Sequence, residues 1–97
     1  MPKRTQRQST KHDNAVQDVA KRYEGLGYNV RADISGYDKP KSIQNKRPDV
    51  TATKNGEKII VEVETLDSMG TDKAQREVFR DYTNSHKNTR FRTKLAK

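Results

Sequence analysis

The chain contains no cysteine and no tryptophan, and apolar residues make up only 29% of its 97 positions. The absence of cysteine excludes disulfide bonds, thiolate zinc sites and cysteine nucleophiles, and it fits a reducing compartment. No stretch is long and apolar enough to span a membrane. The basic N-terminus is not followed by the apolar stretch of a signal peptide, so we expect a cytoplasmic protein.

The hydrophobic core is expected to be small. Four tyrosines and two phenylalanines are the only aromatic residues, and 35% of the chain is charged. A chain of 97 residues forms one domain near the small end of the usual range. Because such a domain buries little apolar surface, a monomer would be marginally stable, and we expect a homodimer or a bound partner.

Positive charge is concentrated at the two ends of the chain. Residues 1–11 contain four basic residues and residues 87–97 contain five, with no acidic residue in either segment. Since the net charge is +8, residues 12–86 carry a net charge of −1. Basic arms of this kind bind polyanions such as nucleic acid, although short charged tails are also often only solvated.

A further group of basic residues lies in the central part of the chain, between positions 39 and 47. Together with the arms it predicts a surface for DNA. The residues expected to contact nucleic acid are Lys3, Arg4, Arg7, Lys11, Lys39, Lys41, Lys46, Arg47, Arg90, Arg92 and Lys94.

The strongest local signal is the dipeptide Asn55-Gly56, which favours the type I′ turn of a two-residue hairpin. A turn at these residues places Lys54 opposite Glu57 and Asp49 opposite Glu62. Side-chain alternation supports this register, because it collects the apolar residues of both strands on one face. That face contains Val50, Ala52, Ile59, Val61 and Val63, and the opposite face contains Asp49, Glu62 and Glu64.

Three carboxylates therefore meet on the polar face of this hairpin. Directly opposed residues of a hairpin have Cβ atoms roughly 5 Å apart, and like charges there are destabilising. Glu64 follows Glu62 by two residues, which is about 6.6 Å along a strand. The cluster predicts a site for a hard divalent cation such as Mg²⁺, which takes oxygen ligands. Alternatively, these acids are ordinary solubilising residues on the outer face of an edge strand.

A helix is predicted over residues 11–24, before the hairpin. Ser9 or Thr10 is the expected cap of its start, and Gly25 or Gly27 is expected to end it. Its apolar residues recur with the period of a helix, at Val16, Val19, Ala20 and Tyr23.

Strand and helix patterns follow one another through the rest of the chain. The second helix presents Ala74, Val78, Phe79 and Tyr82 on one face. The predicted elements after the first helix are, in order, a strand over 28–34, a basic loop over 35–46, the hairpin strands over 48–54 and 57–65, the second helix over 71–85 and a short strand over 91–95.

The element order α-β-β-β-α-(β) predicts an α/β (α+β) domain, in which a small mixed β-sheet is flanked by helices. We expect the chain to divide into a flexible basic arm (1–10), the folded domain (11–86) and a basic C-terminal segment (87–97) that includes the last strand.

The sequence resembles the PD-(D/E)XK nuclease superfamily. Pro48-Asp49 is followed by twelve residues and then by Glu62-Val63-Glu64, after a helix that ends near Leu26-Gly27-Tyr28. Restriction endonucleases and archaeal Holliday-junction resolvases belong to this superfamily, and the similarity covers residues 12–85. It implies a restriction endonuclease-like fold and a DNA endonuclease that depends on Mg²⁺ (or Mn²⁺). By this resemblance, Asp49, Glu62 and the backbone carbonyl of Val63 bind the metal ion.

The chain departs from the family at the position of its usual lysine, which Glu64 occupies. Some members carry Glu there, and in others another element supplies the lysine, for which Lys73 in the predicted second helix is the candidate. The resemblance implies that Glu64 binds a second metal ion or orients the attacking water as general base. Lys73 would stabilise the developing negative charge.

The resemblance also implies an auxiliary polar residue in the first helix. His12, Asp13 and Gln17 are the candidates. A surface histidine is the simpler interpretation of His12, because histidine is intermediate in its burial among proteins.

Two other functions fit the sequence. A family member without the lysine can keep the fold and bind DNA without cutting it. A DNA-packaging or regulatory protein would instead depend on its basic ends alone. The endonuclease is the primary interpretation, acting as a nucleoid-associated protein or as a viral protein in a host cell.

Overall fold

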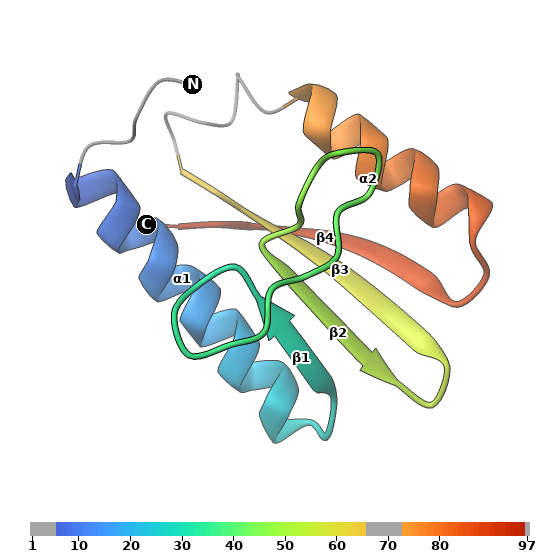
Figure 1. Ribbon diagram of the computed structural model, residues 1–97, viewed down its shortest axis with the longest axis horizontal. Coiled ribbons are helices and arrows are strands. Elements are labelled where there is room, and N and C mark those ends of the chain that lie inside the picture. The colour runs from blue at the N-terminus through green and yellow to red at the C-terminus, as the bar shows by residue number, and fades with distance from the viewer. Residues whose placement is uncertain (1–5, 66–72, 97) are drawn as a thin grey trace.

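The computed structural model describes residues 6–65 and 73–96, with side chains from Thr10 onwards. Its strands form one four-stranded sheet in the order β1-β2-β3-β4 (Figure 1). This mixed sheet with two helices confirms the predicted fold class and element order. The elements are α1 (Gln6–Gly25), β1 (Asn29–Ala32), β2 (Val50–Lys54), β3 (Glu57–Glu64), α2 (Lys73–Ser85) and β4 (Thr89–Leu95).

The hairpin of β2 and β3 has the register that side-chain alternation predicts. Lys54 pairs with Glu57, and Val50 pairs with Val61. Asn55 and Gly56 form the turn with φ values of 52° and 83°, the positive angles that a type I′ turn requires. Since a slip of one residue would turn every side chain to the other face, this register decides which residues of β3 meet which helix.

The last strand, β4, lies beside β3 and runs parallel to it, from the pair Lys58–Thr89 to the pair Glu64–Leu95. Parallel neighbours need a crossover connection, and α2 lies within this one. The strand is longer than the predicted 91–95, and most of the basic C-terminal segment belongs to it. As a consequence β3 is an interior strand, with β2 on one side and β4 on the other.

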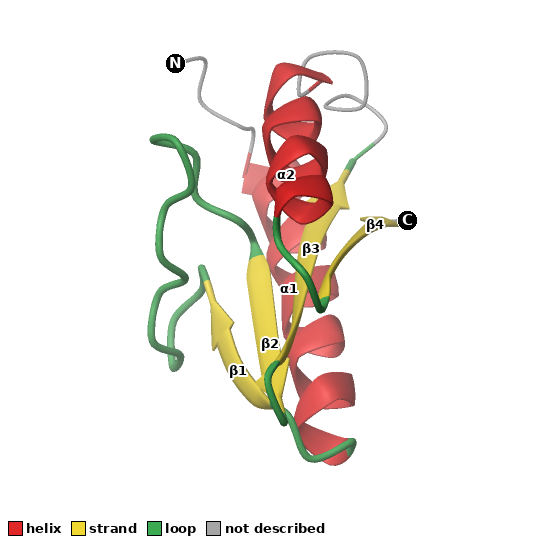
Figure 2. Ribbon diagram, turned by 90° about the vertical axis from the view of Figure 1, so that its right-hand side faces the viewer, coloured by secondary structure: helices red, strands yellow, loops and turns green. Residues whose placement is uncertain are grey.

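The two helices cover opposite faces of the sheet (Figure 2). On the α1 face, the helical stripe around Val16 and Ala20 packs against the alternate residues of the hairpin that sequence analysis placed in the core. On the α2 face, Phe79 packs against Ile60 of β3 and Ile43 of the loop between β1 and β2. This loop thus helps to close the second, smaller core.

The first helix begins at Gln6, earlier than predicted, so Ser9 and Thr10 lie inside it and do not cap it. Residues 6–10, expected in a flexible arm, are helical, and they contain no Gly or Pro that would disfavour a helix. Helix α1 ends at Gly25, and Gly27 takes a φ of 89° in the turn that follows, as the glycine signal predicts.

The second helix has Phe79 as its only fully buried residue among those described, and Ala74 is exposed, contrary to prediction. Val78 and Tyr82 are half-buried beside Phe79. Ala74 lies in the first helical turn, whereas the apolar contacts of α2 are made further along the helix. Within residues 6–65 and 73–96, no helix has the length and apolar character that crossing a membrane requires.

Phe79→Ala is expected to lower the free energy of unfolding by about 3–5 kcal/mol, because it leaves a cavity between α2 and the sheet. Urea denaturation followed by circular dichroism measures this change. Arg80→Ala, at an exposed position of the same helix, is the control and should change stability by less than about 0.5 kcal/mol. Equal losses in the two variants would show that the α2 core does not stabilise the fold.

Candidate active site

Asp49 and Glu62 meet where β2 and β3 separate. The backbone pairing of β2 with β3 ends at Val50 and Val61. Beyond that pair, hydrogen bonds between backbone N–H groups and side-chain carboxylates connect the two segments. The N–H of Val63 donates to Asp49 Oδ2 at 2.8 Å, and the N–H of Asp49 donates to Glu62 Oε1 at 3.2 Å. The predicted opposition of Asp49 and Glu62 is therefore present, and two hydrogen bonds hold it.

Glu62 and Glu64 are buried, with only 2% and 4% of their surface exposed. Both lie on β3, which has a neighbour on each side. The interpretation of these acids as solubilising residues of an edge strand is therefore wrong. Carboxylates in an interior strand cost folding free energy unless they find partners, so their presence calls for a reason other than solubility.

The pKa of Glu62 is raised from 4.5 to about 9, mainly because burial disfavours the charged form. The negative charges of Asp49 and Glu64 raise it further, whereas hydrogen bonds from the Asp49 backbone and the Gln75 side chain oppose the shift. A buried carboxylate with such a pKa, beside other acids, is typical of functional sites. Proton binding and cation binding are two ways to relieve the same repulsion.

His12 of α1 approaches the site from the other face of the sheet. Its Nε2 lies 3.2 Å from Asp49 Oδ1, and its Nδ1 lies 3.4 Å from Asp13 Oδ1. Only 4% of His12 is exposed, so the simpler interpretation of a surface histidine is wrong. Because α1 begins at Gln6, His12 lies well inside the helix and not at its start. Gln17, another candidate, is exposed.

Two residues of α2 reach the glutamates and were missed in the sequence. Gln75 Nε2 donates to Glu62 Oε2 at 2.9 Å, and Arg76 Nη1 lies 3.3 Å from Glu64 Oε1. Lys73, the predicted source of the missing lysine, is exposed at the start of α2. The sequence indicates these two residues only indirectly. Glutamates on an interior strand need hydrogen-bond donors, and the first turns of the following helix contain the amide of Gln75 and the guanidinium of Arg76.

The predicted DNA-contacting residues are distributed over several elements. Lys39 and Arg47 lie 3.2 and 3.8 Å from Asp33, so this carboxylate partly offsets their charge. Lys3, Arg4 and the side chain of Arg7 lie outside what the structure describes. The others are exposed: Lys11 on α1, Lys41 and Lys46 in the loop between β1 and β2, and Arg90, Arg92 and Lys94 on β4.

The oxygen donors at this site fit a hard divalent cation by their chemistry. Asp49 and Glu62 lie in direct contact through the Asp49 backbone, and the charge of Asp49 adds to the effect of burial in raising the pKa of Glu62, a repulsion that a cation would relieve. Among the residues that the structure describes, no three Asp, Glu or His side chains are gathered into a metal-binding group. Glu64, the expected third acid, is instead turned to Arg76.

A family model described as AHJR-like, REase_AHJR-like, matches residues 4–97. No curated protein matches the chain.

The raised pKa of Glu62 makes stability depend on pH. Between 4.5 and about 9 the folded protein retains a proton that the unfolded chain releases. In EDTA, the melting temperature should therefore fall as pH rises through this range, because the stabilising contribution is complete only below 4.5. Thermal melts at several pH values check this.

Glu62→Gln should remove most of that slope, while Glu57→Gln at the exposed start of β3 should keep it. A slope that persists unchanged in Glu62→Gln would assign the pH dependence to another group.

Proposed function

The chain belongs to the REase_AHJR-like family, a restriction endonuclease-like (PD-(D/E)XK) family, and from this membership we propose that it is an Mg²⁺-dependent DNA endonuclease. The observation that carries the proposal is the contact of Asp49 with Glu62 at the point where β2 and β3 diverge. Two acids held against each other inside a basic protein are costly unless a cation or a proton is bound there.

In this proposal Asp49, Glu62 and the carbonyl of Val63 hold the metal ion, with Glu64 as a further ligand or as general base for the attacking water. When bound, Mg²⁺ or Mn²⁺ lowers the pKa of a coordinated water and neutralises charge on the scissile phosphate. The Val63 N–H keeps the Asp49 carboxylate oriented, and Gln75 does the same for Glu62. His12 holds the second oxygen of Asp49 from the other side.

Arg76 is our candidate for the positive charge that the family usually draws from a lysine. It lies 3.3 Å from Glu64, the residue in the lysine position, and its side chain is only 21% exposed. A cation held there could stabilise negative charge that develops on the phosphate. Lys73 remains the alternative from sequence, although its side chain lies at the exposed start of α2.

A second candidate function is DNA binding without cleavage. Glu64 in the lysine position is the observation that favours it, since loss of the lysine accompanies loss of activity in some members of the superfamily. In both proposals the basic residues bind DNA, and a homodimer is the expected assembly. Sedimentation of the protein alone and with DNA tests the dimer.

Asp49→Ala should abolish Mg²⁺-dependent cleavage and leave DNA binding intact or tighter, because it removes a metal ligand and a negative charge. The assay compares duplex, branched and single-stranded DNA in Mg²⁺, Mn²⁺ or EDTA. Asp81→Ala, at an exposed position on α2, is the control. Full activity of Asp49→Ala would exclude the assigned site, and binding without cleavage by the wild type would favour the second function.

Arg76→Gln should lower kcat by about 10²–10³, the range found when one preorganised donor to a developing charge is lost. Lys73→Gln removes the same charge three residues earlier and should leave kcat nearly unchanged. Single-turnover cleavage at saturating enzyme separates this effect from binding. If kcat fell in Lys73→Gln and not in Arg76→Gln, Lys73 would be the residue that stabilises the developing charge.

A further inference from the structure

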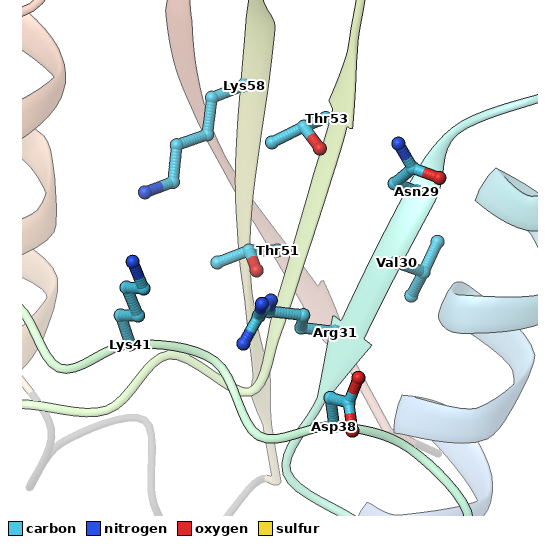
Figure 3. A pocket seen from close by; sticks show the side chains of 8 residues that line it. All are labelled: Asn29, Val30, Arg31, Asp38, Lys41, Thr51, Thr53 and Lys58. Atoms are coloured by element: carbon cyan, nitrogen blue, oxygen red, sulfur yellow. The ribbon is translucent and has the colours of Figure 1, made fainter.

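A basic hollow of about 530 Å³ lies on the α2 face of the sheet, apart from the carboxylate site. We define it by Arg31, Lys41, Lys58, Thr51, Thr53 and Asp38, which come from β1, β2, β3 and the loop between β1 and β2. The charged groups of Arg31, Lys41 and Lys58 point into the space in front of Thr51 and Thr53 (Figure 3). Asp38, its one acidic residue, lies at the end away from Lys58 (Figure 3).

These three cations have no carboxylate partner among residues 10–65 and 73–96, whose side chains the structure describes. Neutral groups hold two of them in place instead: Arg31 donates to the carbonyl of Lys39 at 3.4 Å, and Lys58 Nζ lies 5.3 Å from the centre of the Tyr82 ring. Like charges directed into one space repel, and a bound anion relieves that repulsion.

The lining of the hollow indicates what kind of anion it fits. Small-molecule pockets are predominantly apolar, whereas this one is lined by cations and hydroxyl groups. Lysine, arginine and threonine side chains are among the groups that contact the phosphates of DNA. An extended polyanion that passes over the sheet fits this lining better than a compact apolar ligand.

The position of the hollow relates it to the carboxylate site. Thr51 and Thr53 lie on β2, two and four residues after Asp49, which directly precedes this strand; in extended chain these separations are about 7 and 13 Å. Successive phosphates of one DNA strand are about 3.4 Å apart along the helix axis. If the axis of a DNA duplex runs along β2 with one phosphate beside Asp49, phosphates of the same strand therefore reach the hollow about two to four nucleotides away.

We propose that the basic hollow binds the phosphate backbone of DNA about two to four nucleotides from the phosphate at Asp49 and Glu62, and so sets where the strand lies in the site. This inference rests on the proposed function for its substrate. It adds Arg31 and Lys58 to the residues expected to bind DNA, and it assigns Lys41 to a backbone phosphate in the hollow.

The test is equilibrium binding of duplex and branched DNA in EDTA, where cleavage cannot occur, over a series of salt concentrations. Lys41→Gln should reduce the slope of log K against log salt by about one, and Lys41→Gln/Lys58→Gln by about two, uniformly across DNA sequences. The matched control is Lys21→Gln/Arg22→Gln on the exposed side of α1, which removes the same charge and should leave the slope unchanged. Circular dichroism confirms folding, and Lys41→Gln alone removes no hydrogen bond, ion pair or ring contact among the residues that the structure describes.

A second measurement uses the absence of cysteine in the chain. Lys41→Cys and Lys21→Cys each introduce a single thiol, and DNA should slow the alkylation of the first and not of the second. The proposal would be overturned if DNA slowed the alkylation of both thiols equally. It would also be overturned if the lysine variants of the hollow and their α1 control had the same slope of log K against log salt. Metal-dependent cleavage by the wild type is measured separately, so the nuclease proposal would survive that result. Absence of DNA binding by the wild type in EDTA would also overturn the hollow.

Discussion

The burial of the Glu62 carboxylate is the constraint on which the arrangement of this small protein depends. An acid on an interior strand costs several kcal/mol unless its oxygens are satisfied. One donor is the backbone of Asp49 and the other is the side chain of Gln75. The entry of the chain into β2 and the orientation of α2 are therefore both tied to one carboxyl group, and the candidate site and the fold share the same contacts.

The hairpin and its acids could be predicted from the sequence because their determinants are local. Asn55-Gly56 fixes the turn, the turn fixes the register, and the register places Asp49 opposite Glu62. His12, Gln75 and Arg76 could not be placed in this way. Their positions depend on how two helices pack on opposite faces of the sheet, which the spacing of polar residues along a helix does not determine.

The basic composition of the last strand is compatible with more than one role. Arg90, Arg92 and Lys94 give the C-terminal segment the composition of a solvated basic tail, although a strand is predicted over 91–95, and all three lie on β4, paired with the interior strand β3. Charged residues on an outer strand hinder pairing with other chains. The same residues can therefore protect the edge of a sheet and contact DNA, and composition alone does not separate the two roles.

Because β4 contains most of the basic residues near the C-terminus, cutting the chain before residue 87 would do more than remove charge. It would leave β3 with a row of unsatisfied backbone groups and turn the strand that contains Glu62 and Glu64 into a sheet edge open to other chains. Aggregation or loss of function in such a shortened protein would therefore not test whether the C-terminal basic residues act through their charge. In this fold, the charge of the C-terminal segment can be separated from its architecture only by substitution at individual positions.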